Sequence, residues 1–237
     1  MSRIVGLTAR RRKLSHGPRQ RQPRSGVETG GLAAYGPRGL SPLFIALEGI
    51  DGAGTTTQAA LLCDWFRAIG LRVHRTREPS RGPIGQLLGA LLRGQVVTDP
   101  AATALLFAAD RLDHLQREIE PQLLAGFHVV TDRYLLSSLA YQSLDCPDAW
   151  VASLNSRARP PDAAFLLAVR PEVAAERREA EQRGVELFDA LDTQRRVAEA
   201  YQRLAPGSGT VVLDGEQPVD RVQEEVRSHL ARRLGIE

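Results

Sequence analysis

The sequence predicts an α/β fold of three layers, α/β/α, around a central parallel sheet of about five strands. From Leu43 onward, short apolar runs alternate with longer segments of helical periodicity, which is typical of repeated strand-helix-strand units. Each apolar run is bounded by polar, Gly or Pro residues, as in strands that helices cover on both faces. A chain of 237 residues, 43% of them hydrophobic, is long enough for one large domain of this class.

The expected elements follow one another along the chain. The five predicted strands are Leu43–Glu48, Leu71–Thr76, Phe127–Asp132, Ala164–Val169 and Thr210–Asp214. Seven segments have the spacing of amphipathic helices, namely Thr55–Ile69, Ile84–Arg93, Pro100–Leu124, Leu135–Ser143, Pro171–Arg183, Leu187–Leu204 and Val219–Leu234. Because α/β sheets bind ligands at the carboxyl ends of their strands, residues that directly follow the strands are the first candidates for a site.

Residues 1–41 differ in composition from the rest of the chain. They contain nine Arg and Lys residues and one acid, Glu28, for a net charge of +8, whereas the whole chain carries +3 and the remainder therefore −5. Lacking a hydrophobic period, this segment is predicted to be a disordered leader before a domain spanning 42–237. Three explanations stay open: a nucleic-acid or anionic-surface arm, an organelle transit peptide, and an inert tail or wrongly assigned start.

Bulk composition argues against several classes of protein. No stretch reaches the ~20 apolar residues of a membrane span, and the N-terminus lacks the apolar core of a secretory signal. We therefore expect a soluble, cytoplasmic protein. Cys63 and Cys146 are too few for a disulfide framework and lack metal-site spacing, so both are predicted to be buried, reduced thiols.

A glycine-rich segment directly follows the first predicted strand. It matches the phosphate-binding pattern G-x-x-x-x-G-K-[ST] except that Thr55 stands at the lysine position. In such loops, backbone N–H groups and a helix N-terminus converge on phosphate oxygens. The segment predicts a P-loop NTPase in which Thr56 supplies a hydroxyl to Mg²⁺; a simple connecting turn is the alternative. The predicted ATP-binding residues are Gly49, Ile50, Asp51, Gly52, Ala53, Gly54, Thr55, Thr56 and Thr57.

The missing lysine leaves three possibilities for the site. Removing one preorganised electrostatic donor from an active site costs about 3–4 kcal/mol of transition-state stabilisation. Either another cation replaces the lysine, or activity is low, or the site only binds nucleotide. Since the one lysine of the chain is Lys13 in the leader, any substitute must be an arginine.

Four segments occur in order after residue 46. They are Leu47–Gln58, Arg77-Glu78-Pro79, Leu106–Arg111, and Asp132-Arg133-Tyr134 with Ser137–Gln142. Together they resemble the thymidylate kinase segments E-G-x-D-G-x-G-K-[ST]-T-Q, R-E-P, L-[FY]-x-A-x-R and D-R-[YH]-x-x-S-x-x-A-Y-Q. The resemblance runs from about Leu43 to the C-terminus, and Thr55 is the departure within the first segment.

The resemblance implies an enzyme that transfers a phosphoryl group from ATP with Mg²⁺ to dTMP, in dTTP biosynthesis, as a homodimer. It implies that Asp51 and Arg133 are catalytic and that Asp132 joins Thr56 at the metal. The residues implied to bind dTMP are Asp51, Glu78, Pro79, Arg81, Phe107, Arg111, Arg133, Ser137, Tyr141 and Gln142. The spacing of Phe107 and Arg111 puts both on one helix face, where Phe107 could equally be a core residue.

An arginine-rich segment at about residues 171–188 resembles the lid that covers ATP in this family. Arg177, Arg178 and Arg183 are the candidates to stabilise the transition state, and one of them is expected to offset the missing lysine. Ala53 resembles family members that supply the catalytic arginine from the lid. A solvated helix with Glu partners at i,i+4 is the alternative interpretation of this segment.

Three rival functions remain open on the sequence. Thr55 is compatible with a nucleotide-binding pseudokinase, although Asp51, Asp132, Arg133 and Gln142 favour an active site. A kinase for another nucleoside or nucleotide is the second rival. Nucleic-acid binding through the leader ranks last, because no base-reading module accompanies it.

Overall fold

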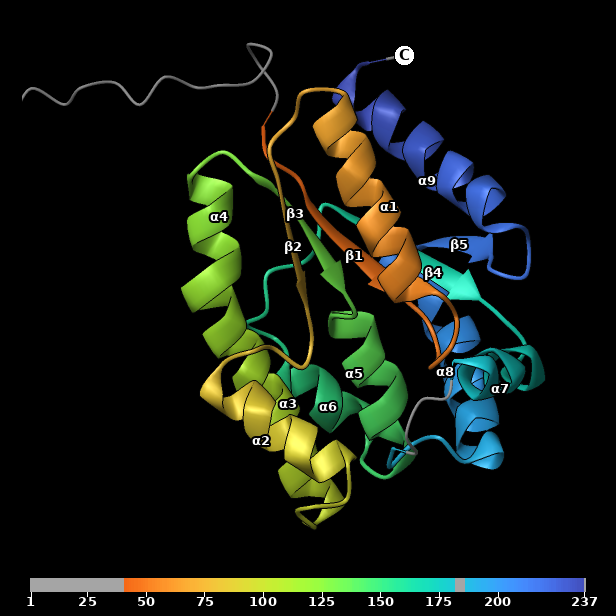
Figure 1. Cartoon of the computed structure of the whole chain (residues 1–237). Coiled ribbons are helices and arrows are strands. Elements are labelled where there is room, and N and C mark those ends of the chain that lie inside the picture. Colours follow the sequence, from red (N-terminus) through yellow and green to blue (C-terminus); the bar gives the residue numbers. More distant parts are fainter. Residues whose placement is uncertain (1–40, 182–185, 237) are drawn as a thin grey trace, which may run out of the picture. The chain divides into compact units, whose positions relative to one another are not determined.

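The computed structural model describes residues 41–181 and 186–236. They form a parallel five-stranded sheet in the order β2-β3-β1-β4-β5 (Figure 1). The strands are β1 (Phe44–Glu48), β2 (Val73–Arg77), β3 (His128–Asp132), β4 (Ala163–Ala168) and β5 (Val211–Asp214). The predicted fold class is confirmed, and all five strands lie within a residue or two of the expected positions. The predicted leader lies outside the described residues except for Ser41.

Helices cover both faces of the sheet (Figure 1). Helices α1 and α9 pack against each other on one face, while α4, α5 and α8 lie on the other. The helices are α1 (Thr55–Ala68), α2 (Pro83–Leu92), α3 (Pro100–His114), α4 (Glu120–Leu124), α5 (Leu135–Tyr141), α6 (Asp148–Leu154), α7 (Pro171–Ala180), α8 (Leu191–Ser208) and α9 (Val219–Leu234), with a π-helical turn η1 (Leu115–Ile119) and a 3₁₀ turn η2 (Gln142–Leu144). Among the described residues, no helix combines the length and apolar composition that crossing a bilayer requires.

The central strand β1 is buried along its whole length because both of its faces are covered. Phe44 and Ala46 pack against η1 and α4, whereas Ile45 and Leu47 point to the cluster that contains α1. Strand side chains alternate between faces, so a continuous apolar run is what a doubly covered strand needs. Glu48, the last residue of β1, is equally buried but charged.

Two helical segments depart from the expected pattern. The predicted helix Pro100–Leu124 contains the π-helical turn η1 just before Pro121. Proline has no N–H to donate and crowds the preceding turn, and a wider turn accommodates it. Helix α6 was not predicted, because its seven residues are too short to show a helical period; Val151 anchors it against Ala104 and Cys146.

The lid segment also has different boundaries from those expected. Helix α7 ends at Ala180, and Arg183 lies outside the described residues. Helix α8 starts at Leu191 instead of Leu187 because the preceding residues form a loop. In that loop the carboxylate of Asp189 accepts a hydrogen bond from the backbone N–H of Glu186 at 2.6 Å.

Candidate active site

A cavity of about 1250 Å³ opens at the carboxyl edge of the sheet. Sites that hold one small molecule typically measure roughly 300–1,000 Å³, so this one has room for two ligands. Its walls come from residues 51–58, 77–81, the inner sides of α2 and α3, residues 132–142, α7 with the following loop, and residues 215–222.

Strand register explains why residues distant in sequence meet at this cavity. Asp132 ends β3 and lies beside Leu47 of β1 on one side and Arg77 of β2 on the other. The glycine loop that follows β1, the Asp132-Arg133 pair and the Arg77-Glu78 pair therefore share one edge. This is the arrangement that the sequence pattern predicted.

The glycine loop needs glycine at a defined position. Gly52 has φ +87°, in the left-handed region, and a Cβ placed there would lie 2.4 Å from the carbonyl oxygen of Ala174 in α7. Neither the backbone conformation nor this close approach tolerates a larger residue. Gly54, with φ +95°, is the N-cap of α1, so the loop leads directly into the first turn of that helix.

Not every predicted ATP-binding residue lines the cavity. Residues 51–57 do, whereas Gly49 and Ile50, at the start of the loop, do not. The side chain of Ile50 is in the core. The carbonyl oxygen of Gly49 accepts hydrogen bonds from the guanidinium of Arg133 at 2.7 Å and from the hydroxyl of Tyr201 at 3.2 Å.

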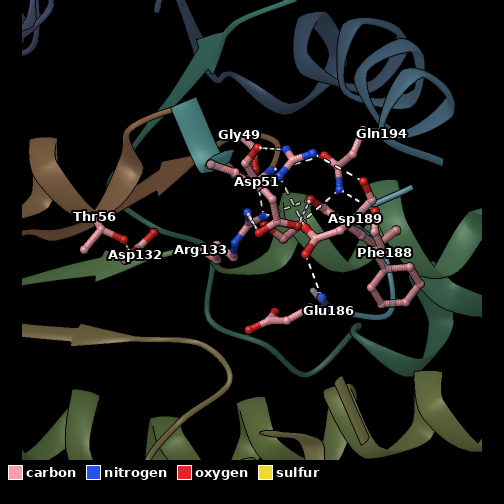
Figure 2. Close-up of polar contacts among 12 residues, drawn as sticks. Gly49, Asp51, Thr56, Asp132, Arg133, Glu186, Phe188, Asp189 and Gln194 are labelled. Carbon is pink, nitrogen blue, oxygen red and sulfur yellow. Dashed lines mark hydrogen bonds and ion pairs between the residues drawn. The ribbon is translucent and has the colours of Figure 1, made fainter. Parts of the chain in front are cut away.

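Arg133 and Asp51 form the polar centre of the cavity (Figure 2). Their side chains make an ion pair at 2.9 Å. The Asp51 carboxylate also accepts hydrogen bonds from the Tyr141 hydroxyl at 3.1 Å and the Gln194 amide at 3.2 Å. Asp51 is thus held by Arg133, which directly follows β3, and by residues of α5 and α8.

The backbone and charge of Arg133 are both unusual. Its φ of 69° places a non-glycine residue in the left-handed region, a conformation that persists where surrounding contacts enforce it and that clusters at functional sites. Its N–H donates to the carbonyl of Leu47 at 2.8 Å. Burial alone would lower the pKa of Arg133, but the phenol of Tyr141 and the carboxylate of Asp51 raise it well above its ordinary value. Arg133 therefore stays charged and cannot take up a proton.

Thr56 and Asp132 form a second polar pair at one side of the cavity (Figure 2). The hydroxyl of Thr56 donates to Oδ2 of Asp132. The other carboxylate oxygen, Oδ1, is buried and has no hydrogen-bond partner among the described residues. A buried, unpaired carboxylate oxygen is costly unless a cation or donor satisfies it, so these two residues fit a hard divalent cation such as Mg²⁺.

Phe107 and Arg111 of α3 both line the cavity, as their four-residue spacing predicts. The side chain of Arg111, however, is 2% exposed, and its guanidinium is bound on several sides. It pairs with Glu78 at 2.6 Å and donates to the carbonyl of Tyr134 at 3.0 Å. Arg111 and Glu78 thus form a buried ion pair beneath the cavity floor.

The other predicted acceptor-side residues line the same cavity but differ in their contacts. Pro79 and the exposed Arg81 come from the loop after β2. Gln142 is buried, and its Oε1 has no hydrogen-bond partner among the described residues. The hydroxyl of Ser137 is bound to protein instead, donating to Glu48 at 2.5 Å.

Glu48 organises a buried network behind the glycine loop. Its carboxylate accepts the N–H groups of Leu136 and Ser137 at the start of α5, at 3.0 and 3.1 Å. The Ser137 hydroxyl also lies 2.8 Å from that of Tyr201, which in turn bonds Gly49. Burial raises the pKa of Glu48, although the hydrogen bond from Ser137 opposes this. The network joins α5 and α8 to the loop that carries Asp51.

The lid arginines of α7 bind backbone carbonyl groups. Arg177 donates to Gly215 at 3.1 Å, and Arg178 donates to the carbonyl of Asp51 and lies 3.5 Å from the carboxylate of Asp189. Across the cavity, the N–H of Leu187 donates to the carbonyl of Leu92 in α2 at 2.8 Å. The lid therefore contacts both the glycine loop and the opposite wall.

Sequence reasoning missed Glu48, Gln194 and Tyr201. One signal for Gln194 exists: it stands on the buried face of α8 with Val197 and Tyr201, where an apolar residue is expected. Glu48 is likewise a charge at the end of an apolar strand. A polar residue in an apolar pattern needs a buried partner, and that requirement marks it as a site candidate.

Comparison with known proteins identifies the family. The family model described as "Thymidylate kinase" matches residues 47–226. A "Probable thymidylate kinase" of Pyrobaculum calidifontis is 42% identical over 194 residues, covering 81% of this chain and 97% of that protein. Proteins with the same description from Thermococcus kodakarensis (39% identical; 82% of this chain, all of that protein) and Methanothermobacter thermautotrophicus (39%; 82% and 97%) match similarly. The chain belongs to the thymidylate kinase family.

Proposed function

We propose that this protein phosphorylates dTMP to dTDP with ATP, a step toward dTTP. One observation carries the proposal: a single cavity joins the glycine loop to the Phe107–Gln142 wall, with the Asp51–Arg133 pair between them. Two nucleotides placed on these walls would meet with their phosphates at a charged centre. The family membership and its relatives, described as probable thymidylate kinases, support this choice of substrate.

On the donor side, residues 51–57 hold ATP. Loop N–H groups and the first turn of α1 face the phosphates, where the helix N-terminus favours negative charge. Gly49 and Ile50 do not line the cavity and contribute by fixing the backbone of the loop, Gly49 through its bond to Arg133 and Ile50 through its place in the core. The attacking oxygen is on the 5′-phosphate of dTMP; its bond to the γ-phosphorus forms while the bond from that phosphorus to the bridging oxygen of ADP breaks.

Arg133 and Asp51 position the acceptor. Because Arg133 remains charged, it binds the phosphate of dTMP and holds it in line with the donor, while Asp51 fixes the guanidinium. Phosphoryl transfer depends chiefly on such positioning and on neutralising charge. Tyr141 and Gln194 keep Asp51 in place from the other side.

Mg²⁺ is the proposed metal, with Thr56 and Asp132 as its protein contacts. Within the described residues there is no group of three or more His, Cys, Asp or Glu side chains suited to a metal. Mg²⁺ in nucleotide enzymes takes one or two protein ligands and completes its shell with phosphate oxygens and water. When bound, it would neutralise charge on the phosphates.

The base of dTMP is proposed to lie between Phe107 and Gln142. Phe107 supplies an apolar ring for stacking, and the unpaired amide oxygen of Gln142 accepts from a ring N–H. Arg81 lines the same cavity and is proposed to bind the acceptor phosphate. Glu78 and Pro79 shape this wall, Glu78 by its ion pair with Arg111. Ser137 supports the wall by bonding the start of α5 to Glu48.

The lid is proposed to exclude water during transfer. Arg177, Arg178 and Arg183 would stabilise charge on the transferring group once the lid encloses ATP. The contacts of Arg178 with the Asp51 carbonyl and of Leu187 with α2 support a closed arrangement over the cavity.

A homodimer and a cytoplasmic location remain proposals from the sequence. Leu105 and Leu112 of α3 support the homodimer, because both are large, exposed and seven residues apart on one helix face. A nucleic-acid partner for the leader is not favoured.

Replacing Phe107 with alanine is expected to raise KM for dTMP with little change in KM for ATP. Losing one aromatic stacking partner costs roughly 1–3 kcal/mol per base. Initial rates measured against each substrate in turn test this. Leu124→Ala is the matched control, since Leu124 is an exposed apolar residue outside the cavity. An unchanged KM for dTMP would place the base elsewhere.

Asp132→Asn is expected to raise the Mg²⁺ concentration that gives half-maximal turnover. An amide keeps the shape of the side chain but removes the negative charge beside Thr56. Magnesium titrations at fixed ATP compare the variant with wild type and with Asp148→Asn, an exposed carboxylate that does not line the cavity. The same magnesium dependence in all three proteins would mean that Asp132 does not contact the metal.

The proposed function is tested by ADP release with ATP and Mg²⁺ in the presence of dTMP, dUMP, dCMP, dGMP or AMP. We expect dTMP to give the highest kcat/KM. Preference for another acceptor would identify a different nucleotide kinase. Thr55 favours one second candidate, a binding protein without turnover; nucleotide binding without ADP release would support it.

A further inference from the structure

Thr55 leaves the donor phosphates without the charge that a lysine would bring at this position. It is the first residue of α1 and is 6% exposed. Its methyl group lies 3.3 Å from the point where a Cβ on Gly49 would stand, so the side chain packs against the loop. A threonine here can donate a hydrogen bond but cannot neutralise phosphate charge.

The described lid arginines are already bound. Arg177 is bonded to Gly215, and Arg178 to the Asp51 carbonyl with Asp189 beside it. Moving Arg178 to the donor phosphates would break its contact with the glycine loop, and moving Arg177 would break its contact with the loop after β5. Among the described residues, a cation that takes the place of the lysine is therefore better sought on another wall, in addition to the charge that the lid would bring to the transferring group.

Arg77 points from the end of β2 toward α1. Side chains of a strand alternate, so Val73, Arg75 and Arg77 share one face. Val73 packs in the cluster that contains α1. Helix α1 packs on β2, whereas the alternate residues His74 and Thr76 bond to Glu118 and His114 on the opposite face.

At the carboxyl end of that face, Arg77 reaches the donor side of the cavity. Its Cα pairs in register with Asp132, whose carboxylate is bonded to Thr56 at the start of α1. Arg77 lines the cavity together with Thr55 and Thr56 and is exposed to it. In the described part of the chain, its guanidinium makes no hydrogen bond or ion pair.

We propose that Arg77 binds the terminal phosphate of the nucleoside triphosphate and supplies the positive charge missing at Thr55. The proposal rests on the function proposed above. A guanidinium can bind two phosphate oxygens at once and remains charged at all working pH values, so it can take over a lysine's role from a neighbouring strand.

The experiment is a double-mutant cycle of wild type, Arg77→Ala, Thr55→Lys and the double variant, with kcat and KM for ATP measured at saturating dTMP. If Arg77 replaces the lysine, Arg77→Ala lowers kcat/KM for ATP by about 100-fold in the Thr55 background. In the Thr55→Lys background the same change costs less than about tenfold, because two sites that share one role are not additive. Arg77→Lys should retain most of the activity.

Arg75→Ala is the matched control, since Arg75 lies on the same strand and face but does not line the cavity. Equal losses from Arg77→Ala in both backgrounds, or no loss in either, would overturn the proposal. The proposal would also be overturned if Thr55→Lys restored the activity of Arg177→Ala or Arg178→Ala but did not restore the activity of Arg77→Ala. Thermal melts establish that each variant is folded.

Binding separates this inference from the proposed function. With Mg²⁺ and no acceptor, Arg77→Ala should weaken calorimetric binding of a non-hydrolysable ATP analogue far more than binding of ADP. That result stands even if wild type shows no transfer to dTMP. An equal effect on both nucleotides, or none, would contradict a contact with the terminal phosphate.

Discussion

Arg133→Ala is expected to lower kcat/KM for dTMP by about 100- to 1,000-fold, because removal of one preorganised donor from an active site costs about 3–4 kcal/mol. The arginine is held in a left-handed backbone conformation with its guanidinium on Asp51 and the Gly49 carbonyl. Such constrained conformations cluster at functional sites, where the orientation of a side chain matters.

The measurement is initial rate against dTMP at saturating ATP and Mg²⁺. Arg203→Ala is the control, since Arg203 forms an exposed ion pair with Asp148. Because alanine also avoids the left-handed region, Arg133→Gly tests whether the loss follows the side chain or the backbone. A loss of less than about tenfold in both variants would exclude Arg133 as the main contact of the acceptor phosphate.

Arg111→Ala is expected to lower the free energy of unfolding by about 3–5 kcal/mol, the usual cost of leaving one partner of a buried ion pair alone. Its partner Glu78 is 4% exposed and would keep only a weak neighbour in His114, at 3.3 Å. The hydroxyl of Ser138 would also lose its contact with Arg111.

Urea denaturation of the purified variant measures this change. The matched control is Arg221→Ala, which breaks an exposed pair with Glu224 and should cost no more than about 1 kcal/mol. Equal, small effects of the two substitutions would mean that water reaches the Glu78 carboxylate. The buried pair would then not support the cavity floor.

The sequence predicts the fold well because its signals are local. Apolar runs such as Phe127–Asp132 gave the strands, and the glycine pattern placed a phosphate loop between β1 and α1. The carboxyl ends of parallel strands lie at one edge of the sheet, so the sequence also predicted that Asp51, Asp132 and Arg133 lie close together. Helix α6, without a full helical period, gave no such signal.

What could not be predicted depends on long-range packing. Gln194 binds Asp51 across 143 residues, and Tyr201 binds Gly49 across 152. No pattern in the sequence pairs positions so far apart. The role proposed for Arg77 depends in the same way on the strand order. Strand β2 lies next to β3, and this pairing puts Arg77 beside Asp132 at the cavity.

The buried contacts of Arg111 and Ser137 also changed how their predicted roles are understood. The family resemblance implied that both bind the acceptor, and both do line the cavity. Their polar atoms, however, bind Glu78 and Glu48. Since spacing along a helix fixes a face but not a hydrogen-bond partner, these residues are better proposed as supports for the wall than as direct contacts.

The most direct test of the central claim follows the γ-phosphate itself. The purified protein is mixed with γ-labelled ATP, Mg²⁺ and dTMP, and the label is separated into dTDP and inorganic phosphate. A dTMP kinase transfers the label to dTDP at a rate that depends on dTMP and is abolished in Arg133→Ala. Label that stays on ATP, or appears only as inorganic phosphate regardless of dTMP, would contradict the assignment.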